Sequence, residues 1–138
     1  MKVLGLDIGS KRIGVALSDA LGITAQGLEN LERKDNENLL TDLKEIVKGG
    51  DVSEIVVGLP LNMDGSEGPG AKEAIAIAEV IEKGLLIPVK LWDERMSTLE
   101  VERLMIAADV SRAKRKKKVD RLAAQVILQS YLNSKKNA

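Results

Sequence analysis

The chain lacks both of the residue types that most often carry catalysis or bind transition metals. Its 138 residues include no cysteine and no histidine. Without cysteine there is no disulfide, no thiolate nucleophile and no cysteine-ligated zinc site. Without histidine the chain lacks the commonest general base and the commonest transition-metal ligand. Any chemistry must therefore come from carboxylates, lysines, hydroxyls, amides or a bound hard cation.

Aromatic side chains and long apolar runs are also scarce. One tryptophan, one tyrosine and no phenylalanine argue against recognition of single-stranded nucleic acid by base stacking. No apolar stretch is long enough to span a membrane, and the N-terminus lacks a signal-peptide pattern. We therefore expect a soluble, cytoplasmic protein with no membrane partner. The length predicts one domain over residues 1–138.

The charges balance in number but not in position. The chain has 21 basic and 21 acidic side chains. Residues 112–138 hold nine basic side chains and one acid, whereas residues 1–111 hold twelve basic and twenty acidic ones. Such a separation is typical of a polyanion-binding patch or of a solvated tail.

Apolar patterning predicts an α/β fold. A short glycine-containing turn joins the first two apolar runs, which favours an antiparallel hairpin, and the later strands alternate with helices. We expect one mixed five-stranded sheet, with its first three strands antiparallel and helices on both faces. The predicted strands are 2–8, 13–18, 23–31, 54–59 and 88–92, and the predicted helices are 35–50, 71–83, 97–108 and 119–132.

Helical periodicity also predicts which side chains face the core. The first helix should bury Leu39, Leu40, Leu43, Ile46 and Val47. The second should bury Ala74, Ile77, Ala78 and Ile81, and the last should bury Leu122, Ala123, Val126 and Ser130.

Acidic residues stand at the ends of several predicted elements. Asp7 is near the end of the first strand, Asp93 and Glu94 follow the last strand, and Asp120 begins the last helix. Ligand sites of open α/β sheets lie at the carboxyl ends of strands, where such side chains can converge. Clustered carboxylates favour a bound cation. Oxygen ligands alone favour Mg²⁺ or Mn²⁺, and two such ions support phosphodiester hydrolysis.

Each of these acids also has an ordinary structural interpretation. Asp7 precedes a glycine turn and is able to bond its N–H groups. Asp93 and Glu94 are explained equally well as surface charge beside Arg95. Asp120 in a first helical turn suits the helix dipole. Spacing alone leaves both interpretations open.

Four stretches in order carry a family resemblance. They are LGLDIGSKRIGVALSD at 4–19, VVGLPLNMDGSEGP at 56–69, WDERMST at 92–98 and KKVDRLAAQVILQSYL at 117–132. Through them the chain resembles the YqgF (RuvX-like) family, described as Holliday junction resolvases or pre-16S ribosomal RNA nucleases. The match spans nearly the whole chain.

The resemblance implies a ribonuclease-H-like fold in which three acids bind two divalent ions. Carried over, these acids are Asp7, Glu94 and Asp120, and the ions are Mg²⁺ or Mn²⁺. Asp93 stays an alternative to Glu94, because successive residues of a strand point to opposite faces and the sequence does not fix the pleat.

Basic and polar residues near these acids are candidates for substrate binding. Asn62, Asp64 and Ser66 offer polar groups on a loop at the mouth of the site. The plainer alternatives are an exposed turn for Lys11 and Arg12, a simple connection for this loop, an ion pair with a neighbouring acid for Arg95, and solvated charge for the basic run. The loop of residues 60–70 is rich in glycine but lacks the Gly-Lys-Ser/Thr of a P-loop. The predicted substrate-binding residues are Lys11, Arg12, Asn62, Arg95, Arg115, Lys116 and Lys117.

The resulting hypothesis is a metal-dependent endonuclease, with structured precursor ribosomal RNA as the first substrate and branched DNA as the second. Paired cuts in a Holliday junction require a two-fold dimer, whereas a monomer favours the RNA role. Two other classes stay open. One is an ATP-dependent sugar-kinase or actin-like protein, and the other is a nucleic-acid-binding module without catalysis.

Overall fold

The computed structural model describes the backbone of residues 1–95 and 112–136, and the side chains of residues 1–95 and 123–135. The helix predicted at 97–108 lies outside the described residues. The described elements follow one another as three strands, a helix, a strand, a helix, a strand and a final helix.

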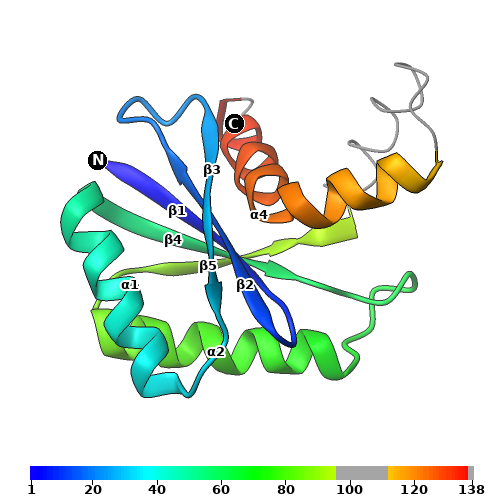
Figure 1. The fold of residues 1–138 in the computed structure, drawn as a ribbon, viewed down its shortest axis with the longest axis horizontal. Coiled ribbons are helices and arrows are strands. Elements are labelled where there is room, and N and C mark those ends of the chain that lie inside the picture. Colours follow the sequence, from blue (N-terminus) through cyan, green and yellow to red (C-terminus); the bar gives the residue numbers. More distant parts are fainter. Residues whose placement is uncertain (96–111, 137–138) are drawn as a thin grey trace.

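A five-stranded sheet forms the centre of the fold (Figure 1). Its spatial order is β3-β2-β1-β4-β5. β1, β2 and β3 pair antiparallel, and β4 and β5 run parallel to β1. This arrangement confirms the predicted mixed sheet. The strands are β1 (Lys2–Ile8), β2 (Arg12–Ser18), β3 (Ala25–Glu32), β4 (Val52–Leu59) and β5 (Val89–Asp93).

Helices cover both faces of the sheet, as predicted. α1 (Asn36–Gly50) and α2 (Pro69–Leu85) lie on one face, and α4 (Arg112–Lys136) lies on the other (Figure 1). α1 begins where Asp35 accepts a hydrogen bond from the backbone N–H of Asn38 at 2.8 Å, a standard N-cap contact.

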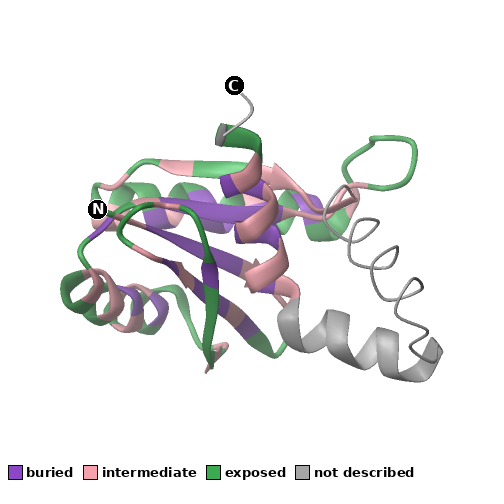
Figure 2. Cartoon of the chain, turned by 90° about the horizontal axis from the view of Figure 1, so that it is seen from above, coloured by how far each residue is buried: buried purple, intermediate pink, exposed green. Residues whose placement is uncertain are grey.

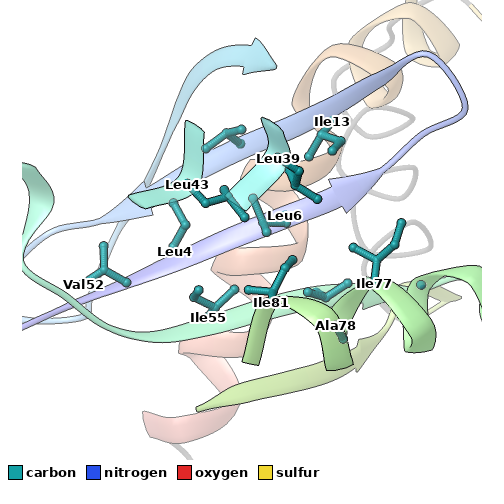
Figure 3. Close-up of a cluster of buried hydrophobic side chains, with 13 residues drawn as sticks. Leu4, Leu6, Ile13, Leu39, Leu43, Val52, Ile55, Ile77, Ala78 and Ile81 are labelled. Atoms are coloured by element: carbon teal, nitrogen blue, oxygen red, sulfur yellow. The ribbon is translucent and has the colours of Figure 1, made fainter. Parts of the chain in front are cut away.

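The larger core lies between the sheet and the pair α1 and α2 (Figure 3). Alternate residues of β1, β2 and β4 point into it, because side chains of a strand alternate between its faces. The predicted inner faces of α1 and α2 are confirmed. Its buried members are Leu4, Leu6, Ile13, Val15, Leu39, Leu43, Val52, Ile55, Val57, Ala74, Ile77, Ala78 and Ile81, and Leu40, Ile46 and Val47 pack against them.

The second core lies under α4, and its helical face differs from the predicted one. Ala123, Val126 and Ser130 are only half-buried, and Leu122 lies outside the described side chains. Ser130 instead accepts a hydrogen bond from the Trp92 indole N–H at 3.1 Å. The helix turns its small and branched residues to the sheet, because the sheet presents glycines there. The buried face consists of Ala124, Ile127, Leu128, Tyr131 and Leu132.

Two helix boundaries also differ from the prediction. α4 begins at Arg112, so the basic run is helical and Asp120 lies inside the helix rather than in its first turn. Lysine and arginine are good helix formers and nothing in the run breaks a helix. α2 continues through Gly84, where Leu40 packs so closely that a Cβ atom would lie 2.7 Å from its methyl carbons.

Burial follows the layers. Figure 2 shows the central strands buried and the outer faces of α1 and α2 exposed. Within the described part of the chain, no helix has the length and apolar character needed to cross a bilayer.

Candidate active site

Asp7 lies on the α4 side of the sheet, near the end of β1. Strand alternation places it on the same side as Val3 and Gly5, opposite the core residue Leu6. In the pairing with β2 it stands beside Gly14. A Cβ atom on Gly14 would lie 3.4 Å from the Cβ of Asp7 and 3.2 Å from that of Ala124. Asp7 is therefore half-buried next to the α4 backbone.

Glu94 reaches the same place from β5. It directly follows that strand, and alternation puts it on the α4 side together with Trp92. It lies over Gly58 of β4: a Cβ atom on Gly58 would collide with the Glu94 carboxylate and lie 2.6 Å from the Ile127 Cδ1. The space left by this glycine therefore holds the carboxyl group between β4 and α4.

The two acids meet in a hydrogen bond. Burial, the hydrogen bond with Asp7 and the negative charges of Asp7 and Asp93 together raise the pKa of Glu94 to about 8. Burial is the largest of these causes. A pKa of about 8 favours the protonated form of Glu94 at neutral pH. The sequence left Asp93 and Glu94 as alternatives, and the structure brings Glu94 to Asp7.

This pair fits a divalent cation. A cation would remove the repulsion between the two carboxylates when both are ionised. The donors are oxygens only, as Mg²⁺ and Mn²⁺ prefer. Among the residues whose side chains are described, no group of three acidic, histidine or cysteine side chains is close enough to hold a metal.

The third predicted acid, Asp120, is placed by its backbone alone. It lies in α4 four residues before Ala124, the residue next to Gly14 and Asp7. One helical turn spans 3.6 residues, so the Asp120 backbone lies about one turn before the contact of Ala124 with the hairpin, on its N-terminal side. Its side chain lies outside the described residues, as do those of Arg115, Lys116 and Lys117.

Asp93 points away from the pair and binds Arg95. The Arg95 Nε–H lies 3.1 Å from each carboxylate oxygen, and an Nη2–H donates to Oδ2 at 2.7 Å. The backbone N–H of Arg95 donates to Oδ1 at 2.9 Å. These hydrogen bonds hold the pKa of Asp93 below its usual value. Among the two interpretations of Arg95, the structure shows the ion pair with a neighbouring acid.

Asn62 belongs to a loop that is closed by its own hydrogen bonds. Its backbone N–H donates to the Ser66 carbonyl at 2.9 Å, and its side-chain amide donates to the Ser66 hydroxyl at 3.0 Å. Asp64 Oδ1 accepts from the Ser66 hydroxyl at 2.6 Å. The Gly65 φ of +88° completes the turn. Asn62 therefore organises the loop in this structure.

Lys11 and Arg12 are exposed at the turn between β1 and β2, beyond Asp7. Arg33 fixes this turn: its backbone N–H donates to the Lys11 carbonyl at 3.0 Å, and its Nη1–H donates to the Gly9 carbonyl at 2.8 Å. Arg33 also forms an ion pair with Glu73 of α2. The two basic side chains thus project from a braced turn.

Sequence reasoning missed two contributors to this site, Gly58 and Arg33. The available signal for Gly58 was a glycine inside an otherwise continuous apolar strand, which is typical of close approach by another group. Arg33 follows a weak third strand and carried no signal, because its partners are distant in sequence.

The comparisons with known proteins identify the family. A family model described as "RuvX: Holliday junction resolvase" matches residues 1–134. A protein of Halothermothrix orenii named "Putative pre-16S rRNA nuclease" is 53% identical over 133 residues, covering 96% of this chain and 95% of the relative. One of the same name from Caldanaerobacter subterraneus is 50% identical over 139 residues, with both chains covered completely.

Solved structures show the same fold. Thermus thermophilus RuvC bound to a Holliday junction matches with a TM-score of 0.64 at 12% identity, covering 100% of this chain and 97% of that one. The fowlpox virus Holliday junction resolvase matches with a TM-score of 0.52 at 15% identity, covering 97% and 99%. The predicted ribonuclease-H-like fold is thereby confirmed. By the family model and by its relatives, this chain belongs to the RuvX family.

Proposed function

We propose that the protein is a divalent-metal-dependent endonuclease that hydrolyses phosphodiester bonds in precursor 16S ribosomal RNA. The observation that carries the proposal is the meeting of Asp7 and Glu94 at the carboxyl ends of β1 and β5. The names of the relatives at about half identity supply the substrate class. No histidine is available as a general base.

Asp7 and Glu94, together with Asp120, would hold one or two Mg²⁺ or Mn²⁺ ions. When bound, such ions activate a water molecule and stabilise the leaving oxygen of a phosphodiester. Glu94 would bind such an ion as a carboxylate, and the bound charge would offset the burial and the negative neighbours that raise its pKa to about 8. Gly58 fixes where the Glu94 carboxylate stands.

The basic groups near the acids would bind the phosphate backbone. Lys11 and Arg12 project from the braced turn beside Asp7. The run with Arg115, Lys116 and Lys117 lies in the same helix that carries Asp120. In Figure 1, β4 and β5 run toward the side where the N-terminal half of α4 lies. Contact with the backbone, rather than base stacking, suits a chain with two aromatic residues.

The experiment compares wild type with Asp7→Asn on precursor 16S RNA and on four-way DNA, with and without Mn²⁺. We expect Mn²⁺-dependent RNA cleavage that falls at least about 100-fold in the variant, because a metal ligand is removed. Asp51→Asn is the matched control, since Asp51 is exposed at the end of α1. Equal cleavage by wild type and Asp7→Asn would refute the site.

Resolution of Holliday junctions is the second candidate, favoured by the description of the family model. Paired cuts require a two-fold dimer. Cleavage of four-way DNA by a species that sediments as a dimer would support it. If neither nucleic acid is cut although RNA binds, the protein is a binding module without catalysis.

A further inference from the structure

We propose that Arg95 is a positioning residue, which together with Asp93 ties the loop of residues 60–68 to the end of β5 beside the acidic pair. The loop in this position would form one wall of the entry for the nucleic-acid backbone. The inference deepens the proposed nuclease function and rests on it for the role of the loop. It differs from the sequence-based prediction that Arg95 grips a substrate phosphate.

The first observation is that Arg95 is already fixed by Asp93. Four hydrogen bonds on the Asp93 carboxylate come from Arg95, three from its side chain and one from its backbone N–H, and both carboxylate oxygens are engaged. About a third of each side chain is exposed. Such a two-pronged pair holds the guanidinium in one orientation, because its planar donors match the carboxylate.

The second observation is that the fixed guanidinium contacts the loop. Its Nη1–H donates to the Met63 carbonyl at 3.2 Å. A Cβ atom on Gly65 would lie 3.7 Å from Nη1 and 4.0 Å from Nη2. The flat group therefore lies against the turn whose geometry depends on Gly65. This contact joins residues 32 positions apart in the sequence.

The third observation is that the loop is closed by its own hydrogen bonds. Asn62, Asp64 and Ser66 bond to one another and to the backbone between them. Residues 60–68 belong to neither described core cluster; Pro60 and Leu61 are half-buried, and Met63 is 84% exposed. The hydrogen bond from Arg95 to the Met63 carbonyl joins this closed turn to the end of β5.

The fourth observation is that this anchorage adjoins the acids. Leu59, the residue before the loop, pairs with Asp93. Gly58, which precedes Leu59 in the chain, lies under the Glu94 carboxylate. Glu94 itself stands between the two residues of the ion pair in the sequence. Breaking the pair would therefore release the loop right next to the acidic pair.

The decisive variants are Arg95→Gln and Asp93→Asn, because they change the charge in opposite directions. If Arg95 gripped a phosphate, Asp93→Asn would free the guanidinium and binding would stay equal or become tighter. If the pair positions the loop, both variants release it and both weaken binding. Lys83→Gln is the matched control, since Lys83 forms an exposed pair with Glu79 on α2.

Two measurements are needed. Amide hydrogen exchange in the free protein follows residues 62–66, and we expect about tenfold faster exchange in both variants. The second measurement is the rate of Mn²⁺-dependent cleavage of precursor 16S RNA as a function of RNA concentration. We expect KM to rise about five- to tenfold in both, kcat to stay within about threefold, and the double variant to match the single ones. Arg95→Lys should recover part of the lost RNA affinity, because lysine still donates hydrogen bonds but lacks the planar bidentate geometry of the guanidinium.

Two outcomes would overturn the proposal. The first is unchanged exchange in both variants. The second is tighter or equal RNA binding by Asp93→Asn alongside weaker binding by Arg95→Gln. Absence of Mn²⁺-dependent cleavage in wild type would instead refute the nuclease function, while the exchange measurement on the free protein would still decide whether Arg95 and Asp93 hold the loop.

Discussion

Among single residues, Glu94 is chemically the least ordinary. Its carboxyl group lies over Gly58 beside Asp7, and burial together with the neighbouring acids raises its pKa from 4.5 to about 8. The neighbouring Asp93 has its pKa shifted in the opposite direction by Arg95. Two adjacent acids thus have opposite behaviour, because strand alternation sends them to different surroundings. The protonated form of Glu94 is therefore favoured at neutral pH, at the place where a cation is proposed to bind.

This proton makes the stability of the metal-free protein depend on pH. The unfolded chain loses the Glu94 proton near pH 4.5 and the folded chain keeps it to about 8. Unfolding then releases a proton between these values, so stability falls as the pH rises through this window, by at most about 1.4 kcal/mol per pH unit. Glu94→Gln should remove this contribution, as measured by urea unfolding at pH 5 to 8.

The control for this series is Glu79→Gln, which changes an exposed glutamate on α2. It should follow the wild-type profile. If the unfolding free energies of wild type and Glu94→Gln changed with pH in the same way, the raised pKa of Glu94 would be contradicted.

Gly58 leads to a prediction about steric fit, because the absence of a side chain there leaves room for the Glu94 carboxylate. In Gly58→Ala the new methyl group meets the flexible ends of Glu94 and Ile127, which are able to rotate away. We expect a stability change below about 1.5 kcal/mol, but at least about tenfold slower Mn²⁺-dependent cleavage because Glu94 is displaced. Paired measurements of unfolding and cleavage test this. A variant with wild-type cleavage would show that the position of Glu94 is not critical.

Among the elements, α4 connects the site to the rest of the fold. Gln129 accepts from the Ala25 N–H at 3.0 Å and donates to the Ile23 carbonyl at 2.9 Å, at one edge of the sheet. Tyr131 donates to Glu54 of β4 at 2.7 Å. These contacts secure the C-terminal half of α4 over the whole sheet. Asp120 belongs to the N-terminal half of the same helix, which runs in a different direction from the anchored part (Figure 1).

The close approach of α4 depends on Gly5. A Cβ atom there would lie 2.8 Å from the Leu128 Cβ and 3.3 Å from the Ala124 carbonyl. Neither atom is the end of a flexible side chain, so the helix itself must shift. We expect Gly5→Ala to cost about 1–3 kcal/mol of unfolding free energy and to slow cleavage through displacement of the helix. Thermal unfolding with an activity assay measures both.

Gly49→Ala serves as the comparison, because a Cβ atom there has no neighbour within 4 Å. Gly49 lies in α1, where alanine favours the helix by up to about 1 kcal/mol. The two substitutions should therefore change stability in opposite directions. Equal effects would mean that the α4 contact tolerates a methyl group.

For the whole molecule, the separation of charge sets the expected salt dependence of RNA binding. Nine of the 21 basic residues follow residue 111, with Asp120 as the single acid among them. Each phosphate contact contributes about 0.7–0.9 to the slope of log affinity against log salt. Replacing Arg115, Lys116 and Lys117 by glutamine should lower this slope by about 2, as measured in binding titrations at several salt concentrations.

The control replaces three exposed lysines of α1 and α2, Lys44, Lys48 and Lys83, and changes the net charge equally. It should leave the slope near that of wild type. Equal reductions by both triple variants would mean that net charge, and not the basic run of α4, governs binding.

Some features of the fold could be predicted from local sequence patterns, because residues close together in the chain determine them. The hairpin, the strand β4 and the inner faces of α1 and α2 follow from periodicity and turn residues. The buried face of α4 did not, since the choice among its faces depends on Gly5 and Gly14 of other strands. The start of α4 was also misplaced, because a run of charge was taken to interrupt a helix that its residues favour.

The sequence by itself determined the kind of chemistry, because without histidine and cysteine the available metal ligands are oxygens. Its apolar periodicity also indicated the strands that carry the acidic residues. Tertiary structure alone placed Glu94, rather than Asp93, beside Asp7. The pleat of β5 becomes fixed only when it pairs with β4, and that pairing turns Glu94 to Asp7 and Asp93 to Arg95. The raised pKa has the same origin, since burial between β4 and α4 exists only in the assembled fold.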